Sequence, residues 1–210
     1  KSEGIETKMI IVSDDIASAS NEDKLKRRGI AGLIFAFKIS GAYSEHGATL
    51  QEVYDLTLRA NNNLRTIGVA ISSCILPEVG KPTFELENDE IEIGMGIHGE
   101  PGIKREKLRK ADLLVDDLCK IIFEDFDLSN SDKVSIMINS LGATPLEELY
   151  IVSKRVNEIF SKKDIEIVKS YVGRYATSLE MAGMSISVLK LDNDLKKALL
   201  DHSECPFWIN

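Results

Sequence analysis

The chain has little of several features that would place it quickly in a class of proteins. Its 210 residues include one tryptophan and three cysteines, and 26 lysines and arginines stand against 34 acidic residues, for a formal net charge of −8. Proteins that bind phosphate backbones need a basic excess, so we expect no direct nucleic-acid partner. The longest apolar run, 29–37, is far shorter than the roughly 20 residues of a transmembrane helix, so we expect no membrane span.

The few cysteines also indicate the kind of cellular compartment in which the protein works. Cys74, Cys119 and Cys205 are scattered without the spacing of a metal site, and their odd number argues against a disulfide framework. Free cysteines are typical of a reducing compartment. Residues 1–4 show no basic segment followed by an apolar one, so we expect no secretory signal. We therefore expect a cytoplasmic protein.

What the sequence does contain is enough apolar residues for a folded core. Hydrophobic residues make up 43% of the chain and charged residues 29%, which excludes general disorder. A chain of this length forms one large domain or two small ones. The best candidate for a boundary is 72–82, which contains Pro77, Gly80 and Pro82.

Hydrophobic periodicity predicts strands and helices in alternation along the chain. Alternating or continuous apolar runs predict strands at 8–13, 67–71, 87–96, 134–138, 165–172 and 184–191. Apolar residues at helical spacing predict helices at 27–43, 49–65, 104–126 and 144–160, with a short helix after residue 192. This order predicts an α/β fold with a largely parallel or mixed sheet.

Local signals refine three of these elements. Thr49 with Glu52 predicts a capping box, and Thr144 with Pro145 and Glu147 predicts a second one. The alternation of acids and isoleucines in 87–96 predicts a strand with one buried and one wet face.

Three histidines are the first candidates for chemistry. His46 lies at a predicted helix end and His202 in a polar tail, where structural roles suffice. His98 follows a strand in the segment 94–102, GMGIHGEPG, where four glycines let backbone and ligand approach closely. A neutral imidazole is both a nucleophile toward carbonyl carbon and a general base. Because glycine-rich turns also form for geometric reasons, the pattern by itself favours a functional and a structural histidine about equally.

The same glycines fit the dinucleotide-binding spacing GxGxxG, but their context argues against it. Residues 101–102 delay the next helix, so its first amides would not meet a pyrophosphate held by Gly94, Gly96 and Gly99. The preceding strand carries acids, whereas the first strand of a dinucleotide fold is buried on both faces. The loop 139–145 and the acidic pair 116–117 are interpreted as structural, and we expect no metal site. In the polar connection 174–178, binding is possible but nothing requires it.

Several motifs in order give a more specific interpretation. They are 14–15 (DD), 27–32 (RRGIAG), 63–70 (NLRTIGVA), 80–84 (GKPTF), 91–102 (IEIGMGIHGEPG) and 177–183 (TSLEMAG). Together they resemble the substrate-binding (K) subunit family of dihydroxyacetone kinases, and the resemblance runs along essentially the whole chain.

The resemblance implies a fold, a ligand and partners. It implies a homodimer of two-domain α/β subunits, with 1–76 the incomplete remnant of the first domain and 77–210 the second domain, which carries the site. It implies that His98 binds the carbonyl carbon of dihydroxyacetone as a covalent hemiaminal, with Gly96 and Gly99 in the substrate-binding loop. It implies no cofactor on this chain, since ATP or ADP with Mg belongs to a nucleotide-binding partner subunit that transfers the phosphoryl group. A phosphoenolpyruvate relay recharges that nucleotide in the bacterial form, whereas the single-chain form uses ATP.

The sequence departs from the family pattern in three places. The family carries, before the equivalent of Lys1, a GGGSGHEP loop and an aspartate that act as acid and base, so we expect this chain to be the later part of a longer protein. Lys26 stands where glycine is usual and Ser73 where proline is common. This leaves as alternatives a co-activator paralogue, which senses dihydroxyacetone and binds a transcription regulator, and a lipid carrier of similar architecture, which a small polar loop suits less well.

Overall fold

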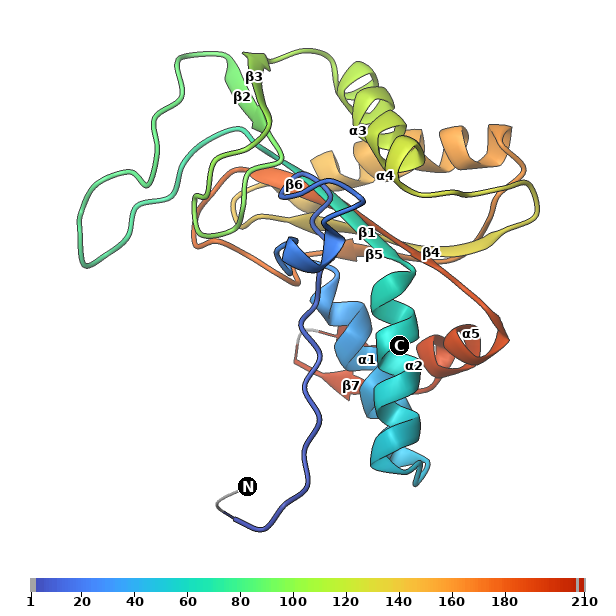
Figure 1. The fold of residues 1–210 in the computed structure, drawn as a ribbon. Coiled ribbons are helices and arrows are strands. Elements are labelled where there is room, and N and C mark those ends of the chain that lie inside the picture. Colours follow the sequence, from blue (N-terminus) through green and yellow to red (C-terminus); the bar gives the residue numbers. More distant parts are fainter. Residues whose placement is uncertain (1–2, 207, 210) are drawn as a thin grey trace.

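The computed structural model describes residues 3–206 and 208–209. A six-stranded sheet lies between two layers of helices (Figure 1). The strands are β1 (Leu64–Ala70), β2 (Glu90–Ile93), β3 (Lys104–Lys107), β4 (Lys133–Ser140), β5 (Glu166–Gly173) and β6 (Gly183–Lys190). The helices are α1 (Leu33–Glu45), α2 (Leu50–Asn62), α3 (Ala111–Asp125), α4 (Leu146–Lys162) and α5 (Asn193–Leu200), with a 3₁₀ turn at Lys24–Lys26. A small hairpin of β7 (Glu204–Cys205) and β8 (Trp208–Ile209) ends the described chain.

The sheet is mixed, as predicted for the fold class. Its order is β3-β2-β1-β6-β4-β5. Strands β4 and β5 pair in parallel, and the other neighbours in the sheet pair antiparallel. The α/β fold expected from the alternation of helices and strands is therefore confirmed.

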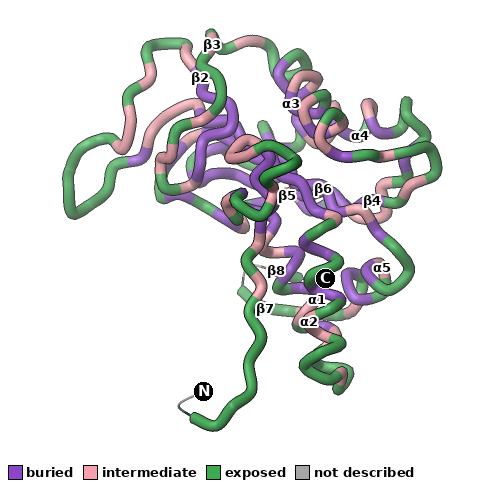
Figure 2. Tube along the Cα trace, viewed as in Figure 1, coloured by how far each residue is buried: buried purple, intermediate pink, exposed green. Residues whose placement is uncertain are grey.

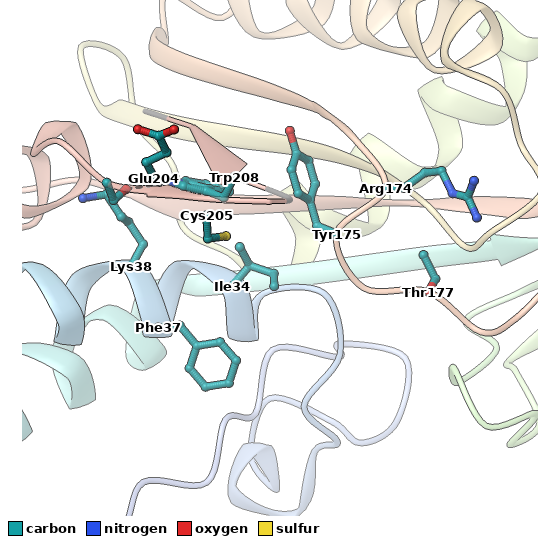
Figure 3. A pocket seen from close by; sticks show the side chains of 10 residues that line it. Ile34, Phe37, Lys38, Arg174, Tyr175, Thr177, Glu204, Cys205 and Trp208 are labelled. Carbon is teal, nitrogen blue, oxygen red and sulfur yellow. Dashed lines mark hydrogen bonds between the residues drawn. The ribbon is translucent and has the colours of Figure 1, made fainter.

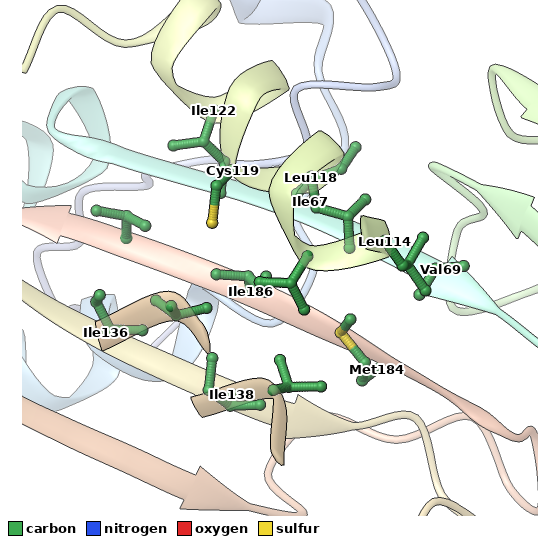
Figure 4. Packing of buried hydrophobic residues seen from close by; sticks show 14 of the residues in the cluster. Ile67, Val69, Leu114, Leu118, Cys119, Ile122, Ile136, Ile138, Met184 and Ile186 are labelled. Atoms are coloured by element: carbon green, nitrogen blue, oxygen red, sulfur yellow. The ribbon is translucent and has the colours of Figure 1, made fainter. Parts of the chain in front are cut away.

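Both faces of the sheet are buried because successive side chains on a strand point to opposite sides. On β4, Ile136 and Ile138 pack toward α3 and α4, whereas Met137 between them packs toward α1, α2 and α5. Figure 4 shows side chains of α3, Leu114, Leu118, Cys119 and Ile122, directed onto the isoleucines of the central strands. The central strands form the inner part of the molecule in Figure 2, with exposed residues around it.

The capping predictions had different outcomes. Thr49 and Glu52 form the predicted capping box at the start of α2. The second box is wrong: Pro145 occupies the N-cap of α4, and the Thr144 hydroxyl accepts a hydrogen bond from the backbone N–H of Gly183 at 2.8 Å. The threonine therefore ties the end of β4 to the start of β6 instead of capping a helix.

Several predicted elements differ from the structure. The helix predicted at 27–43 starts only at Leu33, and the strand predicted at 87–96 is limited to Glu90–Ile93. Residues 8–13 form an extended segment rather than a buried strand, with Met9 79% and Ile11 68% exposed, and only Asp15 beyond them bridges to Thr66 of β1. The helix predicted at 104–126 starts only at Ala111 because Lys104–Lys107 pairs with β2 as an edge strand.

The prediction that one face of 87–96 is exposed to solvent is also wrong at Glu92. Glu92 on β2 is 2% exposed, because its carboxylate lies between the backbone N–H of Gly102 at 2.6 Å and Nε of Arg105 at 2.8 Å. The acid is buried as an ion pair rather than solvated.

The division into residues 1–76 and 77–210 stays a prediction. Strand β1 lies before the proposed boundary, and it pairs with β2 and β6, which lie after it. Across the part of the chain that the structure describes, no helix combines the length and apolar character needed to span a bilayer.

Candidate functional site around His98

The segment Gly94–Gly102, here called the His98 loop, connects two antiparallel strands at the edge of the sheet. β2 and β3 pair with Ile93 opposite Lys104. The loop is fixed at its start, where the Gly94 N–H donates to the carbonyl of Gly68 on β1 at 2.7 Å. Gly94 has φ +80, a conformation that favours glycine. Because a strand rather than a helix follows the loop, the GxGxxG spacing is not a dinucleotide turn, in agreement with the sequence interpretation.

Hydrogen bonds inside the loop bring Glu100 back onto His98. The Gly96 N–H donates to the carbonyl of Glu100 at 3.0 Å, and the Gly99 N–H donates to the carbonyl of Gly96 at 3.1 Å. Glu100 Oε2 accepts from the backbone N–H of His98 at 3.0 Å, and Glu100 Oε1 lies 3.3 Å from His98 Nδ1. The carboxylate therefore holds both the backbone and the ring of the histidine.

Gly96 leaves the space that this arrangement needs. A Cβ at this position would lie 2.2 Å from Glu100 Oε2 and 2.8 Å from Arg28 Nη1. Gly99 has φ +84, and a Cβ there would approach Thr83 to 3.1 Å. The two glycines expected in the substrate-binding loop therefore have clear structural roles, and their contact with a substrate stays a prediction.

Arg28 connects the loop to a segment far away in the sequence. Its guanidinium contacts Asp15 Oδ2 through Nε at 2.9 Å and Nη2 at 2.7 Å, and Nη2 also donates to the carbonyl of Gly94 at 3.2 Å. Burial raises the pKa of Asp15 to about 6, against the attraction of Arg28. This bridge fixes the start of the His98 loop to the segment before α1.

The neighbouring Asp14 organises the start of α1. Its carboxylate is fully buried and accepts hydrogen bonds from the N–H groups of Ile30 at 2.9 Å and Gly32 at 2.8 Å. A Cβ on Gly32 would lie 2.5 Å from Asp14 Oδ2, so close packing explains this glycine. Burial raises the pKa of Asp14.

Other motif segments also meet near the His98 loop. Thr83 lies against Gly99, and Cys74 Sγ lies 3.6 Å from Thr83 Oγ1 and 3.5 Å from Ser178 Oγ. Residues far apart in sequence, from 14–15 to 177–183, are thus linked to one loop by short chains of contacts. This convergence is what a ligand site at the end of strands needs.

The His98 ring itself is open to solvent, with 80% of the side chain exposed. Nδ1 faces Glu100, and among the described residues Nε2 has no hydrogen-bond partner. A reachable imidazole with one nitrogen free can attack a carbonyl carbon or accept a proton. The arrangement therefore supports the chemistry expected of His98.

The other polar candidates have structural partners. His46 Nε2 lies 2.9 Å from Asp201 Oδ2. Asp116 pairs with Arg155, and Asp117 has its own arginine partner. Over residues 3–206 and 208–209, no three His, Cys, Asp or Glu side chains gather as a metal site would require.

A half-open pocket of about 760 Å³ lies away from the His98 loop. Figure 3 shows it between Ile34 and Phe37 of α1 and the C-terminal residues Cys205 and Trp208, with Tyr175 directed toward the same space. Trp208 stacks on Tyr171 with ring centroids 4.2 Å apart. The connection 174–178 is held at its base, where the buried Asn139 side-chain oxygen accepts hydrogen bonds from the backbone N–H groups of residues 175 and 176.

The sequence interpretation assigned no role to three residues of this site. Glu100, Arg28 and Glu92 all lie in the quoted motifs, but their partners depend on how the strands pair. For Glu100, a carboxylate two positions after the candidate histidine is a signal in the sequence that could have been used. For the other two, the spacing along the chain gives no such signal.

Residues 1–207 match the family described as the Dak1 domain. Among curated relatives, the dihydroxyacetone-binding subunit of PTS-dependent dihydroxyacetone kinase 1 from Listeria innocua is 44% identical over 190 residues, which cover 90% of this chain and 58% of the relative. The chain therefore spans less than two thirds of that relative's length.

Solved structures agree with this match. The dihydroxyacetone kinase from C. freundii in complex with AMP-PNP and Mg²⁺ superposes with a TM-score of 0.87 at 30% identity, over 99% of this chain and 38% of that chain. A dihydroxyacetone kinase operon co-activator superposes with a TM-score of 0.87 at 28% identity, over 96% of this chain and 62% of that one. A DegV lipid-binding protein from Thermotoga maritima, with a TM-score of 0.53 and 14% identity over 77% of this chain and 56% of that chain, shares the fold alone.

Proposed function

Because the chain belongs to the Dak1 domain family, we propose that it is the dihydroxyacetone-binding part of a dihydroxyacetone kinase. The family expected from the sequence motifs is thereby confirmed. The proposal covers what this chain does with the triose, and the observation that carries it is the exposed His98 ring with Nε2 directed to no partner among residues 3–206 and 208–209.

In the proposed step, His98 holds the triose through a covalent bond. The Nε2 lone pair forms a bond to the ketone carbon, and the π pair of the carbonyl moves onto its oxygen. That oxygen takes one proton from solvent and the ring keeps its Nδ1 proton, so the adduct is a hemiaminal on a positively charged ring and no group leaves. Glycerol has no carbonyl and cannot form this bond, which gives selectivity for the ketone.

The phosphoryl transfer needs groups that this chain does not supply by itself. We propose that a partner subunit or domain carries ATP or ADP with Mg²⁺ and donates to a terminal hydroxyl of the bound triose. We expect the acid and base for that hydroxyl to come from groups outside this chain, and we expect the working unit to be a homodimer. The C. freundii kinase complex with AMP-PNP and Mg²⁺ supports a nucleotide donor in this family.

The adduct can be tested with dihydroxyacetone labelled with ¹³C at the ketone carbon. Added to the natural full-length protein, the label is expected to give a new signal typical of a carbon bonded to both oxygen and nitrogen. His98→Ala is expected to abolish that signal. His46→Ala is the matched control, because this exposed histidine pairs with Asp201 far along the chain, and it is expected to leave the signal unchanged. A wild-type protein that shows only the free ketone contradicts the proposal.

A second candidate is the co-activator that senses dihydroxyacetone without phosphorylating it. The similarity to the operon co-activator favours it, and both candidates bind the same triose. The two are separated by adding the nucleotide-binding partner subunit with ATP and, in a parallel reaction, with the phosphoenolpyruvate relay that recharges the nucleotide in the bacterial form. Formation of the triose phosphate, lost in His98→Ala, supports the kinase, whereas an adduct without turnover supports the sensor.

A further inference from the structure

Glu100 contacts His98 at two points that serve different purposes. Oε2 accepts the backbone N–H at 3.0 Å, and Oε1 lies 3.3 Å from Nδ1 of the ring. We propose that Glu100 is a positioning residue that keeps the ring proton on Nδ1, so that the lone pair of the neutral ring lies on Nε2. This inference rests on the proposed function, in which Nε2 is the atom that attacks the ketone.

The charge of Glu100 decides the direction of this hydrogen bond. Burial raises the pKa of the Glu100 carboxyl, but hydrogen bonds from the backbone N–H groups of Glu100 and His98 and from the His98 ring outweigh it, so the pKa is lowered from its ordinary value. At neutral pH the group is a carboxylate, which accepts hydrogen bonds and has no proton to give. The ring nitrogen that faces it must then be the donor, and the other nitrogen is left unprotonated in the neutral ring.

The loop reserves a place for this carboxylate. A Cβ on Gly96 would lie 2.2 Å from Glu100 Oε2, so a residue with a side chain here would displace the carboxylate. The same Cβ would lie 2.8 Å from Arg28 Nη1, which puts a guanidinium beside the site. Arg28 is itself held by Asp15 and contacts the carbonyl of Gly94. The position of Glu100 is therefore fixed by its hydrogen bond to the backbone of the loop, in the space that Gly96 leaves.

The contact is poorly placed to serve stability alone. The side chains of His98 and Glu100 are 80% and 38% exposed, and exposed pairs of this kind contribute little to folding. For chemistry the contact matters more. As the bond from Nε2 to carbon forms, the ring gains positive charge, and a carboxylate on Nδ1 stabilises that charge and holds the orientation of the ring.

The test measures the tautomer directly, in the absence of triose. In the natural full-length protein labelled with ¹⁵N-histidine, the His98 signals are identified by their loss in His98→Ala. In the neutral ring we expect Nδ1 to be protonated and Nε2 not. Glu100→Gln is expected to reverse this, because the amide has one oxygen for the His98 backbone and presents its NH₂ to Nδ1. Glu124→Gln, on the exposed face of α3, is the matched control and is expected to change nothing.

The same variants are then titrated with dihydroxyacetone. Glu100→Gln is expected to raise the apparent dissociation constant of the adduct by about 10- to 100-fold, the effect of one hydrogen bond to a charged group. A wild-type ring protonated on Nε2, or a Glu100→Gln protein with unchanged tautomer and affinity, overturns the inference. If the tautomer switches but wild type forms no adduct, the positioning role stands and the proposed function fails. If the adduct forms equally well in Glu100→Gln, the proposed function stands and the positioning role fails.

Discussion

The buried carboxylate of Glu92 accepts a hydrogen bond from the backbone N–H of Gly102 at 2.6 Å, and so closes the base of the loop that carries His98. Glu92 lies on β2 before the loop and Gly102 ends it. Arg105 on β3 pairs with the same carboxylate at 2.8 Å, so its charge is compensated. The base of the His98 loop is therefore held by an acid that lies on β2, outside the loop.

Glu92→Ala is expected to lower the free energy of unfolding by about 1–3 kcal/mol, because it leaves the Gly102 N–H without its acceptor in a partly buried place. It is also expected to speed proteolysis within the His98 loop. Urea unfolding and limited proteolysis measure the two effects. Glu87→Ala is the control, since this side chain is 82% exposed and lies 3.7 Å from Lys107. If the two variants are equally stable, Glu92 does not hold the loop.

Gly96→Ala is expected to weaken the dihydroxyacetone adduct about tenfold by displacing the Glu100 carboxylate, at a cost to stability of about 1 kcal/mol. Gly41→Ala, within α1, is the matched control because a Cβ there meets nothing within 4 Å. It is expected to raise the free energy of unfolding by about 0.5–1 kcal/mol, since alanine favours helix over glycine. Equal adduct affinities in the two variants would show that the space at Gly96 is not needed.

Asp15 is expected to make the protein more stable at pH 5 than at pH 7. Its pKa is raised to about 6 by burial, despite Arg28, whereas an unfolded aspartate titrates near 3.9. Between these values the folded state binds more protons than the unfolded state, so stability falls as pH rises. The contribution over pH 5 to 7 is about 1 kcal/mol. Urea unfolding at both pH values should show this difference in wild type relative to Asp15→Asn. If the two proteins change by the same amount, Asp15 does not titrate in this range.

Much of the fold could be predicted from the sequence, because helix and strand periodicity is local. The capping box of Thr49 and Glu52 and the α/β order are examples. The prediction failed at Lys104–Lys107. Charged residues that favour helices form an edge strand there, with mostly exposed side chains, because β2 provides hydrogen-bond partners. It failed at residues 8–13 because apolar character does not by itself provide a neighbouring strand.

The site was predictable only in part. His98 could be found because glycines surround it and because several motifs occur in order. The contacts of Glu92 with Gly102 and of Arg28 with Gly94 could not, since each depends on which strands and segments become neighbours in space. The alternating pattern indicates that Glu92 is exposed to solvent. Its burial becomes clear only when its partner, the N–H of Gly102, is known.

The most direct test of the account is a crystal structure of the natural full-length protein soaked with dihydroxyacetone. The account predicts continuous electron density from Nε2 of His98 to a tetrahedral carbon of the triose, with Nδ1 still beside Glu100. A planar ketone with density separate from the ring, or triose bound elsewhere, would contradict it.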